Sequence, residues 1–438
     1  MSNYTFSINN YHAIHRADIA IDGLTVLSGL NGCGKSTIAR WIYYAVNGIV
    51  NFEEMAFKQL MLKLEERVRV YARARRTSDQ PFLRMALFHE MEESLDKEVD
   101  FTELTKHFFY IVNEFCDKLS AIVADPTNEH NKELILKYLE LDDLSKNPTA
   151  EEFTVAFREK EKIFLEKVYA EYRQTLSEAH KEDLKVFTQR EYYLNDSAFD
   201  NLSLCEGSAE VIAIGKELFH NFLNIDRAIY IDTPMAVGYR SYPLWEHFNQ
   251  LLVTKNNNGL SYRANSIALD IEKNLNGTIE IDDTHPFYRE LLYIRNIDNL
   301  RLKLSEVATG FKSFAYLQQL LNNGHLDDKT ILLIDEPEAH LHPQWVVEFA
   351  HILVLLHKIV GVRVVVASHS PDFIAAIQSI ARKEEVIDNT RFYLAEESKE
   401  EPTRFDYKDL GQEIDEIFGS FNIAYDRIAL YGEDGMEE

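Results

Sequence analysis

The chain has 438 residues, of which 46% are hydrophobic and 27% charged, a composition typical of a soluble globular protein with room for two or three domain-sized units. Its formal net charge of −26 excludes a protein that binds DNA over most of its surface, although one local basic groove remains compatible with it. Three cysteines without a CxxC spacing (Cys33, Cys116 and Cys205) argue against a structural zinc site or disulfide and favour a reducing compartment.

No segment is predicted to enter the secretory pathway or a membrane. The N-terminal residues lack the basic region and the apolar core of a secretory signal. The most apolar stretch, 345–367, is interrupted by charged and histidine side chains, which favours a buried helix followed by a strand. We therefore expect a cytoplasmic protein that does not contact a membrane.

The first fifty residues predict a small β lobe that leads into a phosphate-binding loop. Residues 5–9 and 17–22 alternate apolar and polar side chains, as two antiparallel strands do. An apolar run at 24–28 predicts a buried strand, and 38–46 has the pattern of a helix. Between them, 29–37 reads GLNGCGKST and fits the pattern G-x-x-x-x-G-K-[ST] in full.

This order of strand, loop and helix is the one that nucleotide binding requires. Glycines let backbone N–H groups turn toward phosphate oxygens, and the helix N-terminus adds the positive end of its dipole. Lys35 can reach the outer phosphates, and Ser36 can hold Mg²⁺. The residues predicted to contact the nucleotide are Asn31, Gly32, Cys33, Gly34, Lys35, Ser36 and Thr37.

Residues 52–185 are rich in Glu, Lys, Leu and Phe at helical spacing, with apolar stripes at 111–122 and 153–169. No heptad repeat persists, so a long coiled coil is not expected. We predict a helical insertion between an N-terminal lobe (1–51) and a C-terminal lobe (186–438).

One segment of the insertion is basic. It either holds nucleic-acid phosphates or forms a solvated helix face that pairs with Glu65 and Glu66. Its members are Arg67, Arg69, Arg73, Arg75, Arg76 and Arg84, with Tyr71 among them.

Strand patterns return after the insertion. Residues 227–232 predict a short buried strand, and Asn276-Gly277 ahead of 278–281 predicts a hairpin. From 302 to 377, helices and strands alternate as in a parallel α/β sheet.

Within this region 331–336, ILLIDE, predicts a buried strand that ends in two carboxylates. Asp335 can bind Mg²⁺ through water, and Glu336 can orient or activate the attacking water.

The next residues resemble a known family. In ABC-type ATPases the strand that 331–336 resembles is called Walker B. Residues 335–343, DEPEAHLHP, are similar to the end of Walker B and the segment that follows it, most closely in the SMC-like and OLD-like groups. There this segment is the D-loop, which contacts a partner subunit. The resemblance thus implies D-loop packing for His340 and His342, with a His/His/Glu metal site as the alternative. Residues 364–371, VVVASHSP, resemble the strand that ends in the switch histidine, so His369 is implied to reach the γ-phosphate.

An ABC signature precedes Walker B, and 304–313, LSEVATGFKS, lie in that place with ATGFK where LSGGQ is common. Two registers put either Ala308 or Thr309 at the usual serine. A helix N-terminus that carries Thr309 and Gly310 can still grip a γ-phosphate. The glutamine of the Q-loop is not placed by any motif, and Gln59 and Gln189 are the candidates.

The resemblance covers roughly residues 1–50 and 225–390 and implies an α/β P-loop head of ABC type, with an antiparallel N-terminal β subdomain, a parallel core sheet and a helical insertion. It implies ATP and Mg²⁺ as ligands, Lys35, Glu336 and His369 in catalysis, and Ser36 and Asp335 at the metal. In this family the signature of a second subunit covers the ATP, so a homodimer or higher homo-oligomer is expected.

Three functions compete for such a head. The first is the sensor or regulatory subunit of a bacterial anti-phage defence complex, similar to the ATPase subunits of Septu or PARIS, with a separate nuclease or toxin effector and DNA as a candidate ligand. The second is an SMC-like ATPase of DNA repair or maintenance. The third is a transporter motor, which the separation of about 300 residues between the loop and Walker B disfavours. After His369 only a hairpin (391–394 and 404–407) and a short helix near 414–417 are expected, so a partner would supply cleavage.

Overall fold

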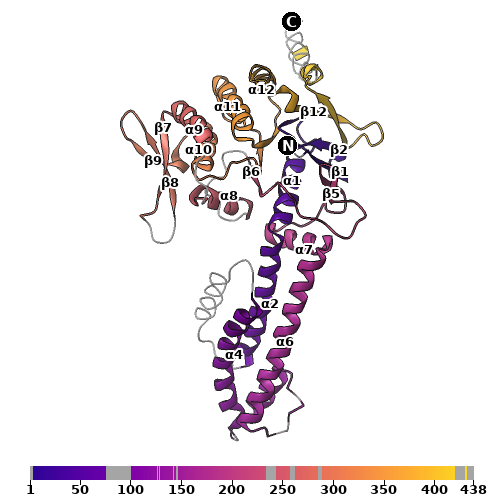
Figure 1. Cartoon of the computed structure of the whole chain (residues 1–438), viewed down its shortest axis with the longest axis vertical. Coiled ribbons are helices and arrows are strands. Elements are labelled where there is room, and N and C mark those ends of the chain that lie inside the picture. Colours follow the sequence, from indigo (N-terminus) through magenta and orange to yellow (C-terminus); the bar gives the residue numbers. More distant parts are fainter. Residues whose placement is uncertain are drawn as a thin grey trace. The chain divides into compact units, whose positions relative to one another are not determined.

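The computed structural model describes residues 3–74, 100–125, 127, 129–141, 143–144, 147–232, 243–256, 262–284, 289–419 and 430–431. They form two compact units (Figure 1). One unit, Asn51–Asp183, consists of helices, and the other combines Met1–Val50 with Leu184–Glu438 around a large sheet.

Among the described residues ten strands form one mixed sheet, in the order β5-β4-β1-β2-β13-β12-β3-β11-β10-β6. Its first part is antiparallel. β1 pairs with β2, as the alternating N-terminal pattern predicts, and also with β4, which pairs with β5; these last two strands were not predicted. The bounds of these strands are β1 Tyr4–Tyr11, β2 Ile14–Ala20, β4 Leu202–Glu206 and β5 Ala209–Ile212.

The other part of the sheet is parallel and holds the most buried strands. β3 lies between β11 and β12, and β10 lies between β11 and β6. Every residue of β3, β10 and β11 is buried, which explains their continuous apolar sequences. The bounds are β3 Leu24–Ser28, β6 Arg227–Ile231, β10 Thr330–Asp335, β11 Arg363–Ala367 and β12 Thr390–Glu397. The predicted α/β class, with antiparallel N-terminal strands and a parallel core, is confirmed.

The C-terminal hairpin joins the two parts of the sheet. β12 pairs antiparallel with β13 (Phe405–Gly411), and β13 runs parallel to β2. The hairpin is expected from the sequence, but its position in the middle of the sheet is not. It therefore connects the antiparallel strands to β3, which precedes the phosphate loop.

Helices α1 (Lys35–Val50), α10 (Thr309–Asn322), α11 (Pro343–Leu355) and α12 (Pro371–Lys383) accompany the parallel strands. By length and composition alone, one described helical stretch, Pro343–Val360, could cross a membrane. However, its residues Val346, Phe349 and Leu353 are buried in the same hydrophobic cluster as β10 and β11. The stretch is therefore a core helix, as predicted.

A smaller antiparallel sheet contains β7 (Gly277–Asp282), β8 (Glu290–Arg295) and β9 (Arg301–Lys303), preceded by α8 (Pro243–Val253) and α9 (Tyr262–Leu275). The predicted hairpin exists as β7 and β8, but Asn276-Gly277 does not form its turn. Gly277 opens β7 opposite Arg295, and a Cβ there would lie 2.4 Å from the Tyr293 ring. This glycine serves close packing.

The helical unit contains α2 (Phe52–Ala74), α4 (Phe101–Ala124), α5 (Glu129–Tyr138) and α6 (Ala150–Glu178), and α7 (Lys181–Tyr192) crosses its boundary. Thr149 begins α6 with a capping box, in which its hydroxyl and Glu152 each accept a backbone N–H. The stripe predicted for α6 is partly wrong, because Val155 and Ile163 are 64% and 58% exposed. The buried positions include Glu161 instead.

Glu161 also corrects the interpretation of the basic segment. Its carboxylate is fully buried and pairs with the Arg67 guanidinium at 2.6 Å, and it accepts a hydrogen bond from Tyr71. Arg67 and Tyr71 are therefore internal residues of this unit and do not face a nucleic acid. Arg69 pairs with Glu65 at 2.7 Å, as the solvated-face alternative predicts. Arg75, Arg76 and Arg84 lie outside the described residues.

Candidate nucleotide-binding site

The phosphate loop lies between the buried end of β3 and the first turn of α1. Gly29, Gly32 and Gly34 have φ values of +148°, +84° and +100°, which side chains with a Cβ rarely adopt. A Cβ on Gly34 would also lie 2.8 Å from Cγ1 of Ile14 in β2. The glycines thus allow the loop to curl and to pack closely on the β lobe.

Lys35 folds back over this loop. Its side chain is buried, and Nζ donates to the carbonyl oxygens of Gly29 and Leu30 at 2.9 and 3.0 Å. A phosphate placed within the loop would offer the ammonium group charged oxygens in place of these neutral ones. Asn31 and Gly32 are exposed, while Ser36 and Thr37 are half-buried at the start of α1.

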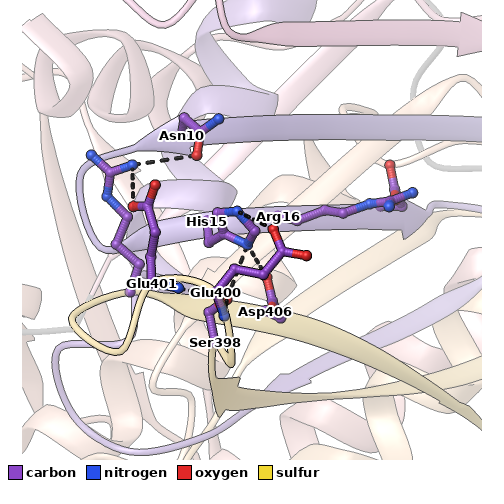
Figure 2. A network of polar contacts seen from close by, with 9 residues as sticks. Asn10, His15, Arg16, Ser398, Glu400, Glu401 and Asp406 are labelled. Atoms are coloured by element: carbon purple, nitrogen blue, oxygen red, sulfur yellow. Dashed lines mark hydrogen bonds and ion pairs between the residues drawn. The ribbon is translucent and has the colours of Figure 1, made fainter.

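The C-terminal hairpin of β12 and β13 contacts the phosphate loop through Tyr407. The Tyr407 hydroxyl donates to the carbonyl oxygen of Cys33, whose side chain is fully buried, so this cysteine is a packing residue. Beside it, His15 Nδ1 lies 2.7 Å from Asp406 and 3.1 Å from the Ser398 hydroxyl (Figure 2). Burial raises the pKa of Asp406, but hydrogen bonds from Ser398 and His15 outweigh it and hold that pKa below its ordinary value. Because both partners meet the same ring nitrogen, this cluster is not a nucleophile–base–acid relay.

The remaining predicted polar residues follow neighbouring parallel strands. Asp335 ends β10 opposite Ala367 of β11, and Ala367 in turn lies opposite Leu27 of β3. The carboxyl ends of these strands share one edge of the sheet, where ligands of open α/β sheets bind. The structure thus brings Asp335, Glu336 and His369 to the same edge as the phosphate loop.

Asp335 has the environment of a metal ligand. It is 5% exposed, its Oδ2 accepts a hydrogen bond from the Tyr230 hydroxyl at 3.2 Å, and Oδ1 has no hydrogen-bond partner among the described residues. Burial raises its pKa, although the nearby Ser36 hydroxyl and the hydrogen bond from Tyr230 favour the carboxylate and act in the opposite direction. A buried carboxylate with one free oxygen beside a serine hydroxyl fits Mg²⁺, which binds through few protein ligands plus phosphates and water.

Glu336 and His369 face each other across the ends of β10 and β11. Glu336 has φ +48°, a left-handed conformation that a hydrogen bond from its N–H to the Ala367 carbonyl (2.8 Å) helps to hold. Its Oε1 lies 3.6 Å from Nδ1 of His369. Both side chains are partly exposed, at 37% and 45%, so they are accessible to a substrate.

Glu338, which no motif singled out for a role, holds the histidine segment. Its carboxylate is 8% exposed, and Oε1 accepts hydrogen bonds from the Ser368 hydroxyl (2.8 Å) and from the backbone N–H of His369 (3.0 Å). The same oxygen lies 3.5 Å from His369 Nδ1. Two carboxylates near Nδ1 favour a proton on that nitrogen, which leaves Nε2 for another partner.

The signature-like segment lies beside the residues that follow Walker B in the same chain. Ala308 is the N-cap of α10 and provides no side-chain cap, and Thr309 is the first helical residue. A Cβ on Gly310 would lie 3.0 Å from the carbonyl oxygen of His340. His342 is exposed and caps α11 by accepting from the N–H of Gln344. In the described ranges no group of three or more His, Cys, Asp or Glu is placed to hold a metal ion, so no arrangement there supports the metal-site alternative for these histidines.

A cavity of about 440 Å³ opens beside the first turns of α1. It is lined by Thr37, Arg40, Trp41 and Tyr44 on one face of α1, by Tyr11 and His12 at the β1–β2 turn, and by Leu194, Asp196, Asp232, Leu244 and Trp245. The rings of Tyr11 and His12 stack, with centroids 4.1 Å apart. The cavity therefore combines aromatic rings with the charged side chains of Arg40, Asp196 and Asp232, and it adjoins the end of the phosphate loop.

Three further residues, Arg40, Tyr230 and Asp232, lie at the candidate site but belong to no motif in the sequence. Asp232 follows β6 next to β10 and pairs with Arg40 at 3.3 Å, and Arg40 also donates to Tyr230. Neither Q-loop candidate follows a strand of the sheet, since Gln59 lies in α2 and Gln189 in α7. The position after the strand next to Walker B is Asp232. The signal in the sequence that could have identified Asp232 was the strand pattern at 227–232, which ends in this acidic residue.

Comparisons with known proteins identify the family. A family model described as AAA ATPase domain matches residues 4–374, and no curated protein matches the chain. Solved structures that resemble it include the Smc head bound to the C-winged helix domain of ScpA (10% identity, TM-score 0.38, 93% of this chain and 97% of that chain). Others are an Smc head with an extended coiled coil from Pyrococcus furiosus (11%, 0.34, 97% and 99%) and the SMC head domain from Thermotoga maritima (9%, 0.37, 94% and 99%). At these TM-scores the assignment rests on the family model, which spans most of the sequence. The chain belongs to the AAA ATPase domain family.

Proposed function

We propose that this ATPase hydrolyses ATP in a Mg²⁺-dependent reaction at the carboxyl ends of β3, β10 and β11. The observation that supports this most directly is the meeting of a phosphate loop, a buried carboxylate and a glutamate–histidine pair at one sheet edge. Mg²⁺, held by Ser36 and Asp335, would neutralise charge on the phosphates. Lys35 would bind the outer phosphates, and Glu336 would orient or activate the attacking water. His369 would contact the γ-phosphate through Nε2.

The cavity beside α1 is suited to the base and ribose of the nucleotide. It includes Thr37, the last residue of the phosphate loop, and the stacked Tyr11 and His12 rings supply flat surfaces on which a base can stack. The loop residues from Asn31 to Ser36 would then surround the phosphates with their backbone N–H groups.

We propose further that the site is completed by a second copy of the chain. The N-terminus of α10 has no side-chain cap, so its first N–H groups and Thr309 suit an anion. In the ABC-type arrangement that the motifs resemble, Thr309 and Gly310 of one subunit would cover the ATP on the other. ATP would then favour a homodimer or a higher homo-oligomer by binding the closed state more tightly.

A complementation experiment tests the composite site. Lys35→Ala removes the phosphate-loop cation, whereas Thr309→Glu repels the γ-phosphate while suiting a helix N-terminus. Each variant alone is expected to be inactive. An equal mixture forms mixed dimers with one site free of both changes, so about a quarter of the wild-type activity should return if dimers exchange randomly. No recovery despite verified exchange of subunits would contradict a composite site.

The biological role that we propose is a cytoplasmic regulatory or sensor subunit of an anti-phage defence complex with a separate nuclease or toxin effector. The support is the sequence resemblance, together with an insertion whose longest described helix, α6, has 29 residues, too short for the arms of a large DNA-repair clamp. DNA is a candidate ligand. Purification of the native complex tests this role: a co-purifying nuclease or toxin is expected, and a complex of repair or transport proteins would contradict it.

A further inference from the structure

Asp335 is held by a chain of hydrogen bonds that begins on α1. Nε of Arg40 donates to the Tyr230 hydroxyl at 3.2 Å, and this hydroxyl donates to Oδ2 of Asp335 at 3.2 Å. The guanidinium also pairs with Asp232 at 3.3 Å. Arg40 thus connects the helix that begins at Lys35 with the carboxylates at the ends of β6 and β10.

The Tyr230 hydroxyl is a fixed donor. The residue is 1% exposed, so water does not compete for its hydroxyl. Because the hydroxyl oxygen accepts from Arg40, its own proton is directed at Asp335. It engages one oxygen of Asp335, while the other, Oδ1, has no hydrogen-bond partner within the described part of the chain.

We propose that Tyr230, itself oriented by Arg40, is a positioning residue that turns Oδ1 of Asp335 toward Mg²⁺. This inference rests on the proposed function, because it assumes that Asp335 binds the metal. The last torsion of an aspartate has a broad minimum, so an unsupported carboxylate can rotate. A hydrogen bond to Oδ2 removes that freedom, and the loss of such orienting partners typically weakens metal binding by about 10- to 100-fold.

Arg40 has a second effect on the same site. Asp232 follows β6, and Asp335 ends the neighbouring strand β10. The guanidinium pairs with the Asp232 carboxylate at 3.3 Å while it donates to the Tyr230 hydroxyl, so one side chain holds Asp232 and orients the donor to Asp335. Arg40 and Tyr230 therefore act on Asp335 through one connected network, and their contributions to metal binding should not be additive.

The test is metal affinity, measured separately from turnover. Tyr230→Phe removes only the hydroxyl, and Tyr316→Phe is the matched control, because Tyr316 is equally buried and its hydroxyl has no partner among the described residues. Binding of Mn²⁺ is followed by electron paramagnetic resonance with a non-hydrolysable ATP analogue. Tyr230→Phe should weaken Mn²⁺ binding about tenfold or more, and Tyr316→Phe should not change it. The Mg²⁺ concentration for half-maximal hydrolysis should rise in parallel, with the KM for ATP at saturating Mg²⁺ little changed.

Three further variants separate the possible failures. Arg40→Met should also weaken Mn²⁺ binding. The double variant of Arg40→Met with Tyr230→Phe should bind Mn²⁺ only slightly less tightly than whichever single variant has the lower Mn²⁺ affinity. Unchanged Mn²⁺ affinity in correctly folded Tyr230→Phe overturns the inference, as does an equal loss in Tyr316→Phe. Asp335→Asn tests the underlying site. If this variant binds Mn²⁺ like the wild type, the proposed metal site is wrong. If Asp335→Asn binds Mn²⁺ weakly but Tyr230→Phe binds it normally, only the positioning role of Tyr230 is wrong. If Tyr230→Phe does not fold, Arg40→Met and its Mn²⁺ affinity decide.

Discussion

Glu338 holds His369 at two points, since its Oε1 accepts the backbone N–H at 3.0 Å and lies 3.5 Å from Nδ1 of the ring. Glu338→Ala removes both contacts, so we predict that kcat falls about tenfold or more while the KM for ATP changes little. Glu338→Gln keeps an acceptor oxygen and should lose less. Steady-state kinetics of the two variants, with thermal unfolding as the folding control, checks this. Equal losses, or a change confined to KM, would remove Glu338 from the positioning of His369.

The ionised Asp335 carboxylate should lower the free energy of unfolding at neutral pH. Burial raises its pKa above the ordinary value of 3.8, so the folded state binds the proton more tightly than the unfolded state does. The contribution of this group to the free energy of unfolding therefore falls as pH rises through the folded pKa and stays low above it. The fall is about 1.4 kcal/mol for each tenfold difference in proton affinity between the folded and unfolded states.

We predict that Asp335→Asn abolishes hydrolysis but raises the unfolding midpoint near pH 7, and that this gain shrinks as pH falls toward 4. Asp298→Asn is a control of opposite sign, because the hydrogen bond from Arg295 holds the pKa of Asp298 at about 2. Removing that carboxylate should not stabilise the protein at neutral pH. Thermal unfolding across pH measures both, and an Asp335→Asn variant less stable than the wild type at pH 7 would contradict the account.

The buried pair of Arg67 and Glu161 should dominate the stability of the helical unit. Arg67→Met leaves a fully buried carboxylate whose one remaining partner among the described residues is Tyr71, which we expect to cost about 3 to 5 kcal/mol. The double variant with Glu161→Leu removes both charges and should recover most of the loss. The control is Arg69→Met, whose exposed pair with Glu65 is worth about 0.5 kcal/mol or less. Hydrogen exchange within Asn51–Asp183 measures these differences. Equal effects of Arg67→Met and Arg69→Met would show that the pair is not buried in solution.

Two glycines of the phosphate loop allow a matched comparison. Gly32 and Gly34 both have positive φ, but a Cβ on Gly32 meets nothing within 4 Å, whereas one on Gly34 lies 2.8 Å from Ile14. Gly34→Ala should therefore lower the thermal unfolding midpoint more than Gly32→Ala does, because it adds a steric overlap to the backbone strain. The nucleotide-free protein is used, so that ligand binding does not contribute. Equal midpoints would contradict this packing of the loop on β2.

The parts of the candidate site that are encoded locally could be proposed from the sequence. Lys35, Ser36 and Asp335 are named by short motifs in which spacing alone defines the chemistry. Tyr230 and Arg40 could not be found this way. Tyr230 lies 105 residues from Asp335 and 190 from Arg40 in the chain, and only the parallel pairing of β6 with β10 brings them together.

A similar limit applies to the fold. Alternation of apolar and polar residues identified β1 and β2, but nothing local shows that β13 inserts beside β2 and connects the two parts of the sheet. In α6, hydrophobic periodicity assigned Val155 and Ile163 to the buried face, but both side chains are exposed. The buried face instead includes Glu161, which pairs with Arg67, and a pattern of apolar residues cannot predict a buried ion pair. Buried polar groups depend on partners that are distant in sequence.

The central claim is that Glu336 supports hydrolysis of an ATP that also holds two chains together. Glu336→Gln, incubated with ATP and Mg²⁺ and examined by light scattering with quantification of bound nucleotide, tests it most directly. We predict a stable dimer that retains unhydrolysed ATP, and a monomer without nucleotide when Lys35→Ala is added. Turnover at the wild-type rate by Glu336→Gln, or bound ATP without dimerisation, would contradict the account.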